Sequence, residues 1–230
     1  MKLLTKTTIP ALALALLLSA CGGGTNGPAT ATDSPSPSAS PAETQPPQTS
    51  EPSPSPSPTP ETPAKASTAQ EAAAAVILAL KEKDLDTLAA YIHPGKGLLF
   101  SPYGHIDTAT AKVFPADGLP ALTDSTVYNW GAYDGTGDPI ELTFKEYYDK
   151  FVYGKDFINA EEVGDNEIKG HGNTIVNIEE VFPGSRVMDY YFSGFDKQYE
   201  GMDWQSLILV LEESEGAWYV SAIVHNQWTI

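Results

Sequence analysis

Cysteine is almost absent from this chain. Only Cys21 among the 230 residues is a cysteine, so no internal disulfide can form, and residues 22–230 offer no thiolate for catalysis or for a metal. The histidines show neither HxH nor HExxH spacing, the patterns that indicate a zinc site. We therefore expect no metal and no cofactor, and a folded region that is stabilised by its hydrophobic core alone.

Basic residues are also scarce, at 13 Lys and Arg against 30 Asp and Glu. Residues 1–65 hold three basic and four acidic residues, which leaves 10 and 26 for residues 66–230. A protein that binds nucleic acid needs a basic surface to displace counterions, so this balance excludes nucleic acid as a partner. It also argues against electrostatic attachment to anionic lipid headgroups. We expect a solvated acidic exterior.

The sequence lacks an apolar run long enough to span a bilayer, which takes about 20 residues. Its longest such run, residues 9–20, has about a dozen residues and follows Lys2 and Lys6, a pattern typical of a secretory signal. Directly after it stands Leu18-Ser19-Ala20-Cys21. This tetrapeptide resembles the lipobox of bacterial lipoproteins. The alternative is an ordinary signal peptide with an incidental cysteine.

The lipobox resemblance implies that residues 1–20 are a signal peptide and that Cys21 receives a diacylglycerol group. Two acyl chains hold a protein stably at a membrane, whereas one chain does so only marginally. We therefore expect a protein of the bacterial cell envelope that contacts the membrane through this lipid, with its folded domain extracytoplasmic.

Aromatic and large aliphatic side chains are missing from residues 22–65, which contain 12 of the 19 prolines among Ser, Thr and Ala. Such a composition cannot bury enough apolar surface to offset the entropy of ordering. Residues 21–65 are therefore predicted to be the lipidated cysteine followed by a disordered, polyproline-rich linker. We expect it to act as a spacer.

Residues 66–230 are predicted to form one domain that begins with two helices. Thr68 and Glu71 have the spacing of a capping box, and an apolar face follows at helical period. Asp84 is the expected N-cap of a shorter helix, and Pro94 ends it. A strand is expected near residues 97–107, a hairpin over 125–143, and a short helix after Thr143.

The remaining residues predict strands. Residues 173–182 and 186–192 are expected to form one hairpin, and residues 204–213 and 217–230 a second. Five consecutive aliphatic residues, 207–211, indicate a central strand that is covered on both faces. Helices followed by antiparallel strands indicate an α+β fold.

Residues 79–94, "ALKEKDLDTLAAYIHP", and 207–230, "LILVLEESEGAWYVSAIVHNQWTI", resemble the two ends of nuclear-transport-factor-two-like and SnoaL-like domains. The resemblance implies N-terminal helices packed on a curved, mostly antiparallel, cone-like sheet that surrounds a pocket. Relatives of this kind use the pocket for isomerase or dehydratase chemistry or for simple binding. No catalytic motif of the family can be placed on this chain.

Acid–base chemistry in such a pocket would need a histidine beside a carboxylate. His105 and Asp107 are two apart and would share one face of a strand, where the carboxylate could orient the imidazole as a base. The alternative is hydrogen-bonded packing or plain exposure. Asp189 and Tyr191 are likewise two apart in a predicted strand and would share one of its faces. The candidates for the pocket are His105, Asp107, Asp189, Tyr191 and His225.

Two further histidines and one acidic loop have simpler interpretations. His93 is expected to stabilise a helix end as a cation, and His171, between two glycines, to face solvent. Asp134, Asp138 and Glu141 lack the spacing of a calcium-binding loop and indicate a turn.

The sequence favours a non-enzymatic surface lipoprotein whose domain binds a small molecule, a cell-wall component or another envelope protein. The alternatives are an envelope enzyme of the isomerase, dehydratase or hydrolase kind, and an accessory domain that only docks a partner. A recognised catalytic motif would favour the enzyme, and the sequence contains none.

Overall fold

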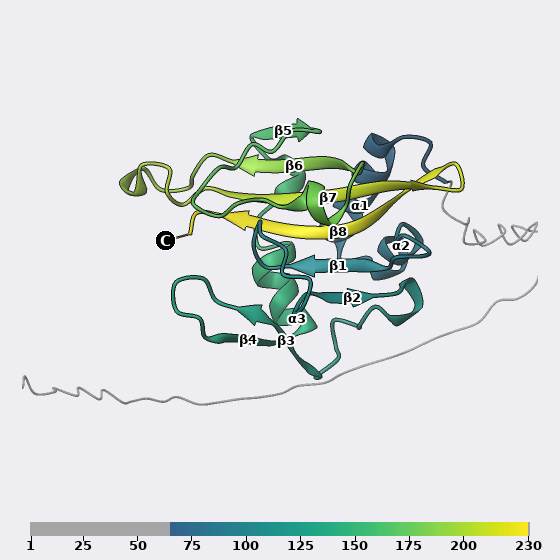
Figure 1. The fold of residues 1–230 in the computed structure, drawn as a ribbon, viewed down its shortest axis with the longest axis horizontal. Helices are drawn as coiled ribbons and strands as arrows, with labels where there is room; N and C mark the ends of the chain where they lie inside the picture. The colour runs from purple at the N-terminus through teal and green to yellow at the C-terminus, as the bar shows by residue number, and fades with distance from the viewer. Residues whose placement is uncertain (1–64, 230) are drawn as a thin grey trace, which may run out of the picture. The chain divides into compact units, whose positions relative to one another are not determined.

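The computed structural model describes residues 65–229 (Figure 1). They belong to a compact unit that runs from Pro56 to Ile230. Cys21, the predicted signal peptide and the predicted linker up to residue 64 lie outside the described residues. Within residues 65–229, no helix combines the length and the apolar character that a membrane span requires.

The main element is a six-stranded sheet, and its strands run in Figure 1 from β5 at the top to β2 at the bottom. β1 pairs with β8 in parallel, and every other pair in the sheet is antiparallel. The expected α+β class with a mostly antiparallel sheet is therefore confirmed. In spatial order the strands are β2 (Lys112–Phe114), β1 (Leu98–Ser101), β8 (Ala217–Gln227), β7 (Gln205–Ser214), β6 (Arg186–Phe192) and β5 (Glu162–Asp165).

The other elements are short, apart from the first helix. A separate two-stranded ribbon consists of β3 (Val127–Ala132) and β4 (Pro139–Thr143). The α-helices are α1 (Ala69–Glu82), α2 (Leu85–Ala90), α3 (Phe144–Tyr147) and α4 (Ile178–Val181). The 3₁₀-helices are η1 (Ala116–Gly118), η3 (Phe157–Asn159) and η4 (Lys197–Tyr199), and η2 (Tyr148–Val152) is a π-helical turn.

The two N-terminal helices begin where they were predicted, although α2 ends at Ala90, before the predicted end at Pro94. The Thr68 side chain accepts a hydrogen bond from the Glu71 amide at 3.1 Å, and Asp84 does the same for Thr87 at 3.0 Å. The Glu71 carboxylate, however, accepts from both the amide and the hydroxyl of Ser67, which differs from the reciprocal box expected with Thr68. The apolar face of α1 is buried against the sheet.

The predicted hairpin over residues 173–192 is wrong. Only β6 is a strand there, and its partners are β5 and β7. Residues 178–181 form the helical turn α4, because Ile178 and Phe182, four apart, both turn toward the sheet and are buried on it. The second predicted hairpin is confirmed as β7 and β8, and β7 is buried on both faces as expected.

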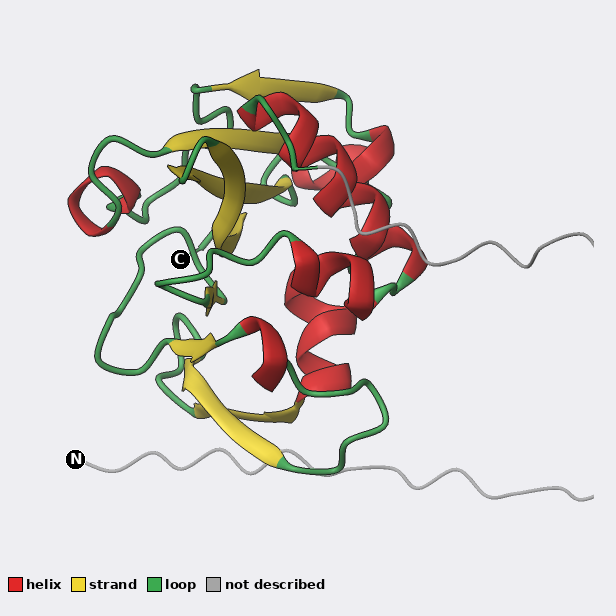
Figure 2. Cartoon of the chain, turned by 90° about the vertical axis from the view of Figure 1, so that its right-hand side faces the viewer, coloured by secondary structure: helices red, strands yellow, loops and turns green. Residues whose placement is uncertain are grey.

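The two faces of the sheet carry separate hydrophobic clusters. The first face packs against α1 and against aromatic rings from β1, β3, α3 and η2, and Figure 2 shows most helical turns on one side of the strands. The second face, with Val187, Ile208, Val210 and Val224, is covered by α4 and the loop before it. Since both clusters lie within residues 66–224, the unit from Pro56 to Ile230 contains its own core, as independent folding requires.

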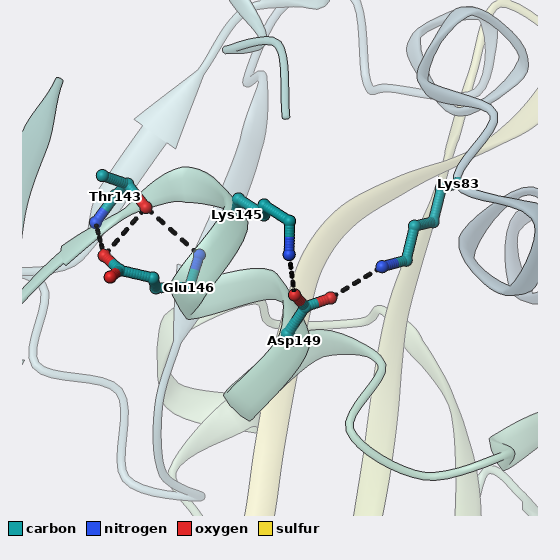
Figure 3. A network of polar contacts seen from close by, with 5 residues as sticks. All are labelled: Lys83, Thr143, Lys145, Glu146 and Asp149. Atoms are coloured by element: carbon teal, nitrogen blue, oxygen red, sulfur yellow. Dashed lines mark hydrogen bonds and ion pairs between the residues drawn. The ribbon is translucent and has the colours of Figure 1, made fainter. Parts of the chain in front are cut away.

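The predicted helix after Thr143 exists as α3 and continues into η2. A capping box between Thr143 and Glu146 starts it, as Figure 3 shows. Lys83, at the end of α1, and Lys145 both reach the Asp149 carboxylate. The Tyr148 hydroxyl also donates to the Leu80 carbonyl, so η2 is joined to α1 by polar contacts as well as by packing.

Candidate functional site

His105 and Asp107 do not share a strand face, so that prediction is wrong. β1 ends at Ser101, before Pro102, and both residues lie exposed in the loop that follows. The Asp107 carboxylate accepts hydrogen bonds from the Thr110 hydroxyl at 2.7 Å and the Ala109 amide at 3.0 Å. These bonds, the Thr110 bond foremost, hold the pKa of Asp107 below its usual value. Its role is that of a turn cap.

His225 is a packed core residue. Its imidazole is 2% exposed, meets the Phe151 ring edge-on with centroids 5.7 Å apart, and approaches Gln227 Oε1 at 3.1 Å. Burial lowers the pKa of His225 to about 4. A general base works best when its pKa lies near the working pH, so this imidazole is neutral but weakly basic.

Asp189 and His225 lie on opposite faces of the sheet. Asp189 pairs with Ile208 on β7, and His225 pairs with Leu207, the residue just before it. Because successive residues of a strand point to opposite faces, the two side chains are separated by the sheet itself. Tyr191 shares the second face with Asp189, as predicted, and its ring lies 5.9 Å from that of Trp204. The five candidates therefore do not form one site.

Asp189 instead anchors the loop that connects β5 to α4, residues 166–177, which we call the pocket loop. Its Oδ2 accepts from the amides of Lys169 at 2.7 Å and Gly170 at 3.3 Å, while Asn226 Nδ2 donates to the Gly170 carbonyl at 3.0 Å. Burial raises the pKa of Asp189, against the opposing effect of these amides and of the Ser206 hydroxyl. Trp204 covers Gly170 so closely that a Cβ there would lie 2.3 Å from the ring.

A pocket of about 450 Å³ lies between the pocket loop, α4 and β6, and we call it the sheet-face pocket. This volume falls in the range of pockets that take small molecules. Its walls combine aliphatic and polar side chains. The aliphatic ones are Ile168, Ile175, Val176, Ile178 and Val187, and the polar ones are Asn166, His171, Thr174, Glu179 and Ser185.

The sequence did not indicate this pocket, because residues 173–177 of its loop were assigned to a strand. His171 is exposed, as expected, but it also lines the pocket. The signal that could have found the loop is the pair Gly170 and Gly172, which flank His171 within it, since Trp204 approaches both glycines.

The charged groups around the sheet-face pocket are unevenly arranged. Of the described residues that line it, Glu179 is the one with a carboxylate. Two cationic side chains that are close to the lining residues in sequence form ion pairs with residues outside the pocket lining. Lys169 Nζ lies 2.9 Å from Glu167 Oε2, and Arg186 Nη2 lies 2.6 Å from Asp165 Oδ1. The pocket thus combines an aliphatic wall with an acidic edge.

The remaining candidate residues have structural roles. His93 Nδ1 accepts hydrogen bonds from the amides of Gly95 and Lys96, both at 3.1 Å, so it acts as an acceptor in a turn and not as the cation expected at a helix end. Asp134 and Asp138 lie in the turn between β3 and β4, as predicted, whereas Glu141 belongs to β4 itself. Over residues 65–229, no group of three or more His, Cys, Asp and Glu side chains could hold a metal ion.

A second, smaller pocket of about 200 Å³ is lined by His105, Asp107, Tyr103 and Trp130 among others. It lies beside the aromatic cluster of the first sheet face, where Trp130 stacks on Tyr147.

The chain matches no protein-family model, no curated protein and no solved structure.

Proposed function

We propose that this chain is a lipid-anchored protein of a bacterial cell envelope whose extracytoplasmic domain binds a small molecule in the sheet-face pocket without transforming it. The anchor is supported by the lipobox resemblance of Leu18-Ser19-Ala20-Cys21 behind a signal-like apolar run. A mixed sheet with α1 across one face supports the nuclear-transport-factor-two-like, cone-like assignment, which is also part of the proposal.

The observation that carries binding over catalysis is the separation of the acid–base groups. His225 and Asp189 lie on opposite sheet faces, and the Asp107 oxygens are engaged within a turn. The larger pocket has instead the mixed wall typical of binding sites, in which apolar side chains bury a ligand and a few polar groups orient it.

An acid–base enzyme is the second candidate, because His105 and Asp107 line one pocket. Catalysis there would require Asp107 to release its bond to Thr110. If the protein were this enzyme, His105→Ala would abolish turnover of its substrate, while filling the sheet-face pocket would leave turnover unchanged.

The anchor is tested by expressing the full chain in a bacterium fed an alkyne-tagged fatty acid. Wild type should carry the tag and sediment with membranes, and Cys21→Ser should do neither. Ser19→Ala, which keeps a small residue two positions before the cysteine, is the matched control and should retain the tag. Equal tagging of Cys21→Ser and wild type would refute the anchor.

The pocket is tested with hexan-1-ol as an apolar probe, added to the ¹⁵N-labelled unit from Pro56 to Ile230. Amide resonances of the pocket loop and α4 should shift in wild type, and they should no longer respond in Val176→Trp, where the new ring fills the pocket. Val127→Trp is the control, since Val127 is 59% exposed on the separate ribbon. Shifts scattered over the surface, or none, would contradict binding in the pocket.

A further inference from the structure

The aliphatic wall of the sheet-face pocket continues outward to an uncovered side chain. Ile178 and Val187 are buried at its base on the second sheet face, whereas Ile175 is 79% exposed at its rim. An isolated exposed isoleucine needs no explanation, but this one prolongs an apolar wall that opens to solvent. A ligand with an aliphatic body would contact all three side chains, and it would remove from water chiefly the exposed apolar surface of Ile175.

Glu179 supplies the charge at this pocket. Its Oε1 accepts a hydrogen bond from the Gly184 amide at 3.3 Å, which holds the carboxylate beside the turn between α4 and β6. Within residues 65–229, Glu179 takes part in none of the ion pairs, although Lys169 and Arg186 are close in the chain and are both paired. The carboxylate is therefore free to pair with a cation from a ligand.

The charge of the whole domain acts in the same direction. Residues 66–230 hold 26 acidic and 10 basic side chains, so the surrounding field concentrates cations and repels anions. An anionic headgroup in this pocket would also lie beside Glu179, and the described lining residues include no lysine or arginine to offset that carboxylate. A fatty-acid-like ligand is therefore disfavoured by charge, while its aliphatic body would fit.

We propose that the sheet-face pocket selects small amphiphiles with an aliphatic body and an ammonium-like, cationic head. The body lies against Ile175, Ile178 and Val187, and the head pairs with Glu179. This inference rests on the proposed function, because it names the ligand class of the same pocket.

Three probes of equal chain length separate charge from shape: hexylammonium, hexan-1-ol and hexanoate. Each is titrated into the unit from Pro56 to Ile230 at low salt, and its Kd is taken from the amide shifts of the pocket loop. Hexylammonium should bind about two- to fivefold more tightly than hexan-1-ol, a ratio that corresponds to the stabilisation from a partly screened ion pair. Hexanoate should bind most weakly. Added salt should reduce the difference.

Glu179→Gln is the decisive variant, and Glu180→Gln is its matched control. Both residues lie on α4, both substitutions remove one negative charge, and Glu180 does not line the pocket. Glu179→Gln should make hexylammonium and hexan-1-ol bind equally, whereas Glu180→Gln should preserve most of the preference.

The outcomes separate this inference from the proposed function. If all three probes shift the pocket loop with the same affinity, or if both variants lose the preference alike, the ligand class is wrong while binding in the pocket stands. If none of the probes shifts the pocket loop, or if Val176→Trp leaves the shifts unchanged, both proposals are overturned. Preference for hexylammonium that depends on Glu179 alone supports the inference.

Discussion

His225 should make the domain lose stability in mildly acidic solution. Its ring projects from β8 and is buried against Phe151, and this burial lowers the pKa of His225 from the usual 6.5 to about 4. Unfolding exposes the imidazole, which then binds a proton more readily than it does in the folded state. Because the folded pKa is the lower one, stability is complete above about pH 6.5 and is lost as the pH falls toward 4.

The size of the loss follows from the two pKa values of His225. Between pH 6.5 and pH 5, His225 is protonated in the unfolded state and neutral in the folded state. Each pH unit of that interval lowers the free energy of unfolding by about 1.4 kcal/mol. The free energy of unfolding should therefore fall by about 2 kcal/mol from pH 7 to pH 5. The residue is almost fully buried, so solvent screening does not reduce this figure.

The measurement is urea unfolding of the unit from Pro56 to Ile230, followed by circular dichroism at pH 7, 6 and 5. His225→Leu should remove about 2 kcal/mol of the pH dependence seen in wild type, and His171→Gln, which changes an exposed histidine, should not. Asp189, through its raised pKa, makes the free energy of unfolding change with pH in the opposite direction. Comparing each variant with wild type cancels this contribution.

The ring carbons of His225 provide a direct check by NMR in case His225→Leu does not fold. Their resonances should titrate well below pH 6. Titration near 6.5, or an unchanged pH dependence in His225→Leu, would refute the reasoning, because either result would mean that the imidazole is hydrated in the folded state.

Three further predictions concern packing and charge. Gly170→Ala places a Cβ 2.3 Å from the Trp204 ring and should cost about 1–3 kcal/mol in urea unfolding, while Gly172→Ala, whose Cβ would lie 3.2 Å away, should cost less. Because burial raises the pKa of Asp189, wild type should lose stability as the pH rises from the usual aspartate range through that raised pKa. Asp189→Asn should remove this loss, as urea unfolding at a series of pH values would measure. Phe100→Ala, at the centre of the aromatic cluster, should lower the free energy of unfolding by about 3–5 kcal/mol in the same assay.

The elements that the sequence predicted well are those whose burial repeats along the chain. α1 buries Ala72, Val76 and Leu80 at helical spacing, and the aliphatic run of β7 is covered on both faces. Such patterns are local, so they can be interpreted without knowing what packs against them. β5 has no such pattern, because residues 162–165 are Glu, Val, Gly and Asp with a single apolar side chain, and only its pairing with β6 makes it a strand.

The error at α4 has the same physical origin. Val176, Ile178 and Val181 are β-branched residues that suit a strand equally well. Their conformation was decided by the second sheet face, where Ile178 and Phe182 cover Ile208 and its neighbours. That face includes residues of β7 and β8, which begin only at Gln205 and Ala217, so the local sequence does not contain the deciding contact.

The prediction that the five candidate residues form one site was wrong because of the pairing register between strands. Alternation along one strand correctly placed Asp189 and Tyr191 on the same face, but it says nothing of which face a residue on another strand occupies. Shifting β8 by one residue against β7 would bring His225 to the Asp189 face. The observed pairing of Leu207 with His225 and of Ile208 with Asp189 separates them instead. This pairing places the imidazole against Phe151 in the aromatic cluster and leaves Asp189 to hold the pocket loop, so one register produces both the buried histidine and the anchored loop.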